Sequence, residues 1–112
     1  RVTRYEPLDV RPVATHGWTV TVANVDEETA DVSRREYPLV GWAVCRIVYD
    51  DPRLDDGVPI VKPCWWDVEE LTVGQYDDAF VVCGPGEEPD LKALTHAAIA
   101  AARREYERTV KR

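Results

Sequence analysis

The chain has 112 residues, 45% of them hydrophobic and 31% charged, which is enough to bury the core of a single domain. Its net charge of -7 disfavours nucleic acid as the main partner, because a negative surface repels phosphates. The sequence has no run of about eighteen apolar residues, so a membrane-spanning helix is not expected.

Three cysteines without paired spacing indicate free thiols and a reducing, cytoplasmic setting rather than a disulfide scaffold. The first residues lack the apolar core of a signal peptide. The chain contains no methionine, even at position 1, so we expect that it was trimmed or cut from a longer protein.

The negative charge is concentrated in the middle of the chain. Residues 50–90 carry two basic and twelve acidic side chains, a net charge of -10, whereas residues 91–112 have a net charge of +4. We expect the acidic segment to set the kind of partner that the protein attracts.

Residues 1–16 are expected to be an irregular lead-in, because Pro7 and Pro12 each remove a backbone donor. A single α+β domain is expected over 17–112, with its strands within 17–83. Residues 18–25 alternate as a half-buried strand does, and residues 30–36 predict a short polar edge strand that pairs with it as a hairpin.

Residues 39–49 are apolar on both alternating faces, which predicts a central strand covered on both sides, with Gly41 at a bulge or close contact. Residues 58–65 predict a strand that Pro59 and Pro63 favour at an edge. Residues 67–74 fit a short helical turn or a loop, and residues 76–83 predict a last strand.

The clearest helix is predicted at about 89–109, with acidic residues at its start and arginines toward its end. Its apolar stripe, which includes Leu94 and Ala98, is expected to cover one face of the strand centred on Trp42.

The fold class is therefore α+β: a four- to five-stranded antiparallel sheet, strongly bent or partly closed, followed by one long C-terminal helix. This order of strands and helix resembles that of small SH3-like barrels, although no motif accompanies the resemblance.

The cysteines are the first candidates for chemistry. A zinc site commonly uses closely spaced ligand pairs, so Cys45, Cys64, Cys83 and His16 could bind a metal only through tertiary contact, and no metal or cofactor is predicted. Cys45 and Cys83 are expected to be small buried hydrophobes. Cys64, with His16 or His96 as its base, is the candidate for a catalytic thiol.

Seven aspartates could converge if the turns of the sheet lie together, but their order lacks the pattern of a calcium loop, so we expect solvated turns. They are Asp50, Asp51, Asp55, Asp56, Asp67, Asp77 and Asp78.

The best indication of binding is the pair Trp65 and Trp66, followed by Asp67. Neighbouring residues in a strand point to opposite faces, so at most one indole can enter the same core layer. We expect Trp66 to cap the open end of the core beneath the C-terminal helix. The alternative is an exposed tryptophan beside carboxylates, which is typical of a protein contact site.

The leading prediction is a non-enzymatic protein-interaction module whose acidic, tryptophan-containing surface binds a basic or mixed-charge protein. Its predicted binding residues are Trp65, Trp66, Asp67, Asp50, Asp51, Asp55 and Asp56. The alternatives are a small thiol-dependent enzyme or redox protein centred on Cys64, and a homo-oligomer that buries the outer face of its central strand or helix against a second copy.

Overall fold

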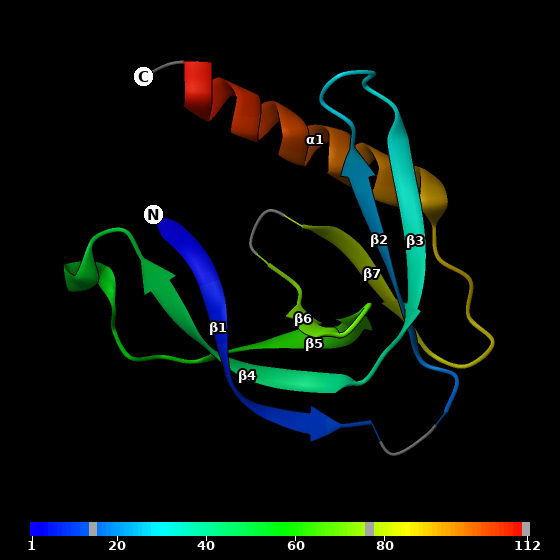
Figure 1. The fold of residues 1–112 in the computed structure, drawn as a ribbon, viewed down its shortest axis with the longest axis horizontal. Coiled ribbons are helices and arrows are strands. Elements are labelled where there is room, and N and C mark those ends of the chain that lie inside the picture. Colours follow the sequence, from blue (N-terminus) through cyan, green and yellow to red (C-terminus); the bar gives the residue numbers. More distant parts are fainter. Residues whose placement is uncertain (14–15, 76–77, 111–112) are drawn as a thin grey trace.

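A computed structural model describes residues 1–13, 16–75 and 78–110, and within them it has seven strands and one long helix (Figure 1). The elements in chain order are β1 (Val2–Pro12), β2 (Thr19–Val25), β3 (Val32–Pro38), β4 (Gly41–Tyr49), the short 3-10 helix η1 (Pro52–Leu54), β5 (Ile60–Asp67), β6 (Glu70–Val73), β7 (Ala79–Cys83) and α1 (Leu91–Val110).

The strands form two antiparallel sheets. Sheet A has the order β1-β4-β5-β6 and is strongly curled, and sheet B has the order β3-β2-β7. Helix α1 packs on sheet B, against β2, β7 and β3. The predicted α+β class, with a bent antiparallel sheet followed by one long C-terminal helix, is confirmed.

A side chain links the two edges of sheet A. The amide of Gln75, just after β6, accepts a hydrogen bond from the Tyr5 N–H at 2.8 Å and donates one to the Tyr5 carbonyl at 3.1 Å. Gln75 thereby takes the place of a neighbouring strand beside β1 and holds sheet A in its curled form. The concave face of the sheet encloses a core cluster that contains Tyr5, Ala43 and Cys64.

The strand covered on both faces is β2, where residues 20–23 are all buried. Val20 and Val22 pack toward Trp65 of sheet A, and Ala23 packs toward α1. The sequence predicted this double burial for β4 instead. β4 lies inside sheet A as expected, but its outer face is open to solvent, and Trp42 on that face is 36% exposed.

The predicted irregular lead-in is wrong for residues 2–12, which form β1 and pair with β4. Prolines fit here because β1 is an edge strand, and its register with β4 shifts between Pro7 and Asp9. Gly41 makes the predicted close contact, since a Cβ there would lie 2.2 Å from the carbonyl oxygen of Arg11. Residues 14 and 15 lie outside the described residues.

β5 is an internal strand and not the edge strand that its prolines suggested. The Pro63 carbonyl accepts a hydrogen bond from the Gly74 N–H, so both backbone groups of Pro63 point toward β6. The N–H that Pro63 lacks would have pointed toward Gly74, just past Val73, the last residue of β6. Its absence therefore does not affect the pairing of β5 with β4 on the other side. β6 itself occupies the segment that fitted a helical turn or a loop.

Helix α1 begins at Leu91, two residues later than predicted, because the Asp90 side chain accepts a hydrogen bond from the Ala93 N–H as a helix cap. Leu94 and Ala98 are buried as expected. They face sheet B, however, and not the strand centred on Trp42.

Candidate interaction site

The two adjacent tryptophans lie in opposite environments, as the alternation of a strand requires. Trp65 is 3% exposed, and its ring stacks on Tyr37 with 5.9 Å between centroids. Phe80 of β7 lies on it at 6.5 Å in a tilted arrangement. Trp65 thus joins the two sheets and is a core residue, so it cannot form the contact surface that the sequence suggested for it.

Trp66 is 54% exposed near the end of β5. It does not cap the core beneath the helix as we expected, because α1 covers sheet B and leaves this end of sheet A open. The position of Trp66 agrees with the alternative, in which its indole faces solvent.

Trp66 stands beside a tight turn with an unusual backbone. Asp67 and Glu70 pair across the hairpin, so Val68 and Glu69 form a two-residue turn. Val68 has a φ of 59° and is 90% exposed. Two-residue hairpin turns ordinarily place glycine or asparagine at such a position, because a β-branched side chain there is strained.

This end of sheet A combines exposed apolar and acidic side chains. We call it the hairpin tip and define it as Trp66, Asp67, Val68, Glu69 and Glu70, all of which are exposed. It carries three carboxylates beside one large and one smaller apolar side chain in sequence, a composition typical of a contact with a basic rim.

The predicted aspartates of residues 50–56 hold their own loop together. Asp51 binds Arg53 through an ion pair at 2.9 Å and also accepts from the Arg53 backbone N–H. Those hydrogen bonds lower the pKa of the Asp51 carboxyl below its usual value. Asp55 and Asp56 accept from the N–H groups of residues 57 and 58.

This loop and the hairpin tip do not form one surface. The loop precedes β5 and the tip ends it, and a strand rises about 3.3 Å per residue, so Ile60 and Trp66 are roughly 20 Å apart along β5. The Asp50 N–H donates to the Arg1 carbonyl at 2.9 Å. Asp78 accepts from the Gln75 N–H at 2.8 Å, and Asp77 lies outside the described residues.

The cysteines are all free and buried, and Cys64 is fully enclosed. Its thiol lies 3.3 Å from the Gly41 carbonyl oxygen, and burial raises its pKa above the usual 9.0. A catalytic thiol must be accessible and must be stabilised as a thiolate. The enclosure of Cys64 prevents access, and its raised pKa disfavours the thiolate. His16 and His96 are exposed, so neither shares the enclosed surroundings of Cys64.

Within residues 1–13, 16–75 and 78–110, histidine, cysteine and carboxylate side chains form no group of three that could hold a metal ion. In the same part of the chain, no helix combines the length and the apolar character needed to cross a bilayer.

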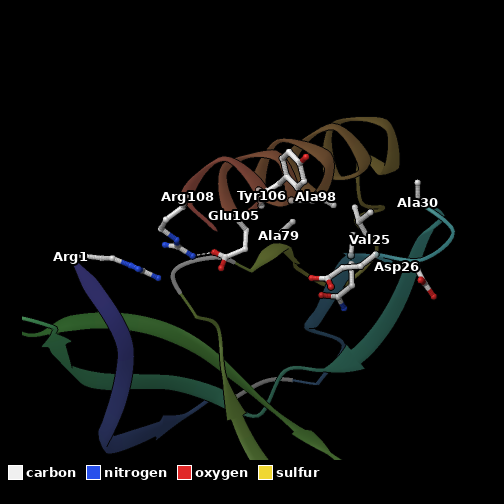
Figure 2. A pocket seen from close by; sticks show the side chains of 14 residues that line it. Arg1, Val25, Asp26, Ala30, Ala79, Ala98, Glu105, Tyr106 and Arg108 are labelled. Atoms are coloured by element: carbon white, nitrogen blue, oxygen red, sulfur yellow. Dashed lines mark ion pairs between the residues drawn. The ribbon is translucent and has the colours of Figure 1, made fainter. Parts of the chain in front are cut away.

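A groove that the sequence did not predict lies beneath the C-terminal half of α1 (Figure 2). Its volume is about 900 Å³, and its walls include Ala79 of β7 and Ala98 and Ala101 of α1. Arg1 and the ion pair between Glu105 and Arg108 lie at one end. The only signal in the sequence is the run of alanines in the middle of the helix, whose small side chains also suit close packing.

No family model, curated protein or solved structure matches the chain.

Proposed function

We propose that this protein is a non-enzymatic interaction module that presents the hairpin tip to a basic or mixed-charge surface of another protein. The observation that carries the proposal is Trp66, a large apolar side chain that is 54% exposed on a hairpin tip that also has three exposed carboxylate residues. Tryptophan is strongly enriched among the residues that dominate binding energy at interfaces.

The strained turn supports the same conclusion. A β-branched residue with positive φ costs free energy, and such strain persists at contact sites when the local geometry is useful. At Val68 the turn holds an apolar side chain at the outermost point of the hairpin. The partner on this proposal offers an apolar pocket for Trp66, with lysine or arginine side chains around it.

The binding surface proposed here is smaller than the one that the sequence suggested. Asp51, Asp55 and Asp56 are engaged in their own loop, and Trp65 is in the core. The proposal retains Trp66 and Asp67 and adds Val68, Glu69 and Glu70. We also propose a cytoplasmic location, because all three cysteines are free thiols.

The test compares Trp66→Ala with Trp42→Ala, which removes another exposed tryptophan from the outer face of sheet A. Proteins captured from a cell extract by the wild type are purified and titrated against each variant by calorimetry. Trp66→Ala is expected to weaken binding by at least about tenfold, which is about 1.4 kcal/mol, while Trp42→Ala leaves it unchanged. Added salt is expected to weaken the wild-type complex, because the carboxylates of the tip contribute.

Equal affinity of wild type and Trp66→Ala for every captured protein would remove the proposal. Loss of binding in Trp42→Ala alone would point instead to the outer face of sheet A.

Self-association through that outer face is the second candidate. Val44 and Val61 pair across β4 and β5, and Val61 is 57% exposed beside Trp42. An exposed apolar sheet face of this kind favours burial against another surface. Light scattering that gives a dimeric mass for the wild type and a monomeric mass for Trp42→Ala would support it.

A further inference from the structure

The C-terminal half of α1 carries apolar side chains that sheet B does not cover. Leu94 and Ala98 are the buried residues of the helix, and no side chain described after Ala98 is buried. Apolar residues nevertheless continue to the end of α1, where Tyr106 is 67% exposed and Val110 is 60% exposed. Exposed apolar side chains at helical spacing are typical of a face that packs against another surface.

These side chains form a stripe, which we call the helix seam and define as Ile99, Ala102, Tyr106 and Val110. Its members are three or four residues apart, so they lie on one face of the helix. At about 100° per residue, the helix seam is turned by roughly 100° from the face that α1 buries against sheet B.

The helix seam borders a hollow of about 410 Å³. Val25, at the end of β2, and Ala30, in the turn before β3, belong to its walls together with three residues of the seam. The hollow therefore offers a second element a place to pack against α1 and the β2–β3 turn at once.

Two charged residues line the same hollow. Arg103 and Glu107 are both exposed and lie one turn apart, on the same flank of the helix seam. An arginine that precedes a glutamate by four residues is the weaker order for pairing within one helix. Among residues 1–13, 16–75 and 78–110, the structure shows no ion pair for either side chain, so both charges are available to a partner.

The helix seam and these charges complement a second copy of themselves. Around a two-fold axis, two identical antiparallel helices contact each other through reciprocal pairs that share one midpoint. Three such pairs have midpoints between positions 104 and 105, which agree to about 1.5 Å along the helix. They are Ile99 with Val110, Ala102 with Tyr106, and Arg103 with Glu107.

The chemistry of each pair suits a contact. The first pair is apolar on both sides, and in the second the small side chain of Ala102 leaves room for the ring of Tyr106 from the other copy. A two-fold axis between antiparallel helices brings equal flanks together, so Arg103 of each copy meets Glu107 of the other at the border of the seam.

We propose that two copies of this protein form a homodimer through their helix seams, with the two helices antiparallel and with reciprocal ion pairs between Arg103 and Glu107.

The distribution of charge is compatible with this contact. The net charge of -7 opposes self-association in general, but residues 50–90 carry -10 and the helix is positive. Residues 99–110 contain three arginines and two glutamates, so this stretch is nearly neutral. Two copies can therefore meet there with little repulsion.

The dimer goes beyond the proposed function, since the helix seam and the hairpin tip share no residue. It also differs from self-association through the outer face of sheet A, which does not involve α1. A dimer would carry two hairpin tips, and two linked sites bind a repeated partner more tightly than one.

The test uses charge reversal at exposed positions, which leaves the core untouched. Sedimentation equilibrium and light scattering measure self-association of the wild type, Arg103→Glu and Glu107→Arg, and circular dichroism checks that each variant keeps its helix. Each variant places like charges across both reciprocal contacts, so its dimer is expected to be at least about tenfold weaker.

The matched control is Arg104→Glu. It makes the same change of charge at an exposed position of α1, but Arg104 does not line the hollow and lies on the opposite side of the helix from the seam. This variant is expected to dimerise as the wild type does, and so is Trp66→Ala.

A mixture of the two charge-reversed proteins tests the reciprocal pairing directly. Arg103→Glu and Glu107→Arg together restore opposite charges at both contacts, so an equal mixture is expected to form a heterodimer although each protein alone is monomeric. Loss of folding in either variant could not produce this rescue.

Several outcomes would overturn the proposal. A wild type that stays monomeric up to roughly 1 mM has no dimer of useful strength. Dimers that survive both charge reversals, that fail equally in Arg104→Glu, or that are not restored in the mixture would exclude the reciprocal ion pairs. A dimer lost in Trp42→Ala and kept in Arg103→Glu would assign self-association to sheet A. None of these results affects the proposal for the hairpin tip.

Discussion

At the scale of single residues, Val68 combines three features that rarely occur together: a β-branched side chain, a φ of 59° and 90% exposure. Replacement by glycine removes the conflict between side chain and backbone at almost no loss of buried surface. We expect Val68→Gly to raise the free energy of unfolding by about 1 kcal/mol, measured by urea denaturation.

The control for this prediction is Val58→Gly. Val58 is also exposed, at 60%, but its φ is not positive, so glycine there should leave stability unchanged or lower it. A Val68→Gly protein that is no more stable than the wild type would show that the turn is not strained.

The sequence predicts that Trp65 and Trp66 lie on opposite faces of the strand, but it does not show which of the two is buried. Alternation along a strand requires that they point to opposite faces, and the structure agrees. Which of them is buried depends on where sheet B lies, and Tyr37 and Phe80, which cover Trp65, are far from it in sequence. A local pattern carries no information about such a contact.

At the scale of elements, two physical causes account for the strands that the sequence missed or misplaced. Prolines weaken a strand only where a backbone donor is needed, and β1 and Pro63 each place the gap where no bond is required. The polar Thr19 and Thr21 made β2 look half-buried, yet Thr21 is only 4% exposed. β2 is buried because it lies between Trp65 of sheet A and α1, and this packing is not visible in a local pattern.

The link between Gln75 and Tyr5 gives the prediction at this scale. Gln75→Leu removes both hydrogen bonds from a partly buried backbone segment and is expected to lower the free energy of unfolding by about 1–3 kcal/mol. Hydrogen exchange at the Tyr5 amide should accelerate more than exchange in sheet B, because β1 loses its contact with the far edge of sheet A.

Thr3→Val serves as the comparison. It removes the bond from the Thr3 hydroxyl to the Val48 carbonyl, but that bond is exposed and water can replace it. A Gln75→Leu protein that is as stable as Thr3→Val would mean that the amide does not hold the edges of sheet A together.

At the scale of the whole molecule, the structure divides the acidic segment that composition presents as a unit. Loop 50–56 and the hairpin tip lie toward opposite ends of β5, and the loop carboxylates mostly bind groups within their own loop. The net charge of residues 50–90 cannot reveal this, because it counts the charged side chains and does not show where they lie or which groups they bind. The groove beneath α1 was equally hidden, since it depends on how the helix crosses sheet B.

The buried thiols make the stability of the whole molecule depend on alkaline pH. Burial raises the pKa of Cys45 and Cys64 above 9.0, and for Cys45 the nearby Cys64 raises it further while Lys62 lowers it. The unfolded chain therefore loses these protons first as the pH rises. Stability is expected to be intact below about pH 9 and to fall above it, by up to about 1.4 kcal/mol per pH unit for each thiol.

Urea denaturation under reducing conditions from pH 7 to pH 10 measures this dependence. The matched variant is Cys45→Ala/Cys64→Ala, which keeps every other titrating group, so its stability should fall less steeply above pH 9 than that of the wild type. The wild-type thiols should also resist iodoacetamide at neutral pH until the protein unfolds, because both are enclosed in the core. Equal slopes in the two proteins, or rapid labelling of folded Cys64, would contradict the prediction and return the thiol to consideration as a reactive group.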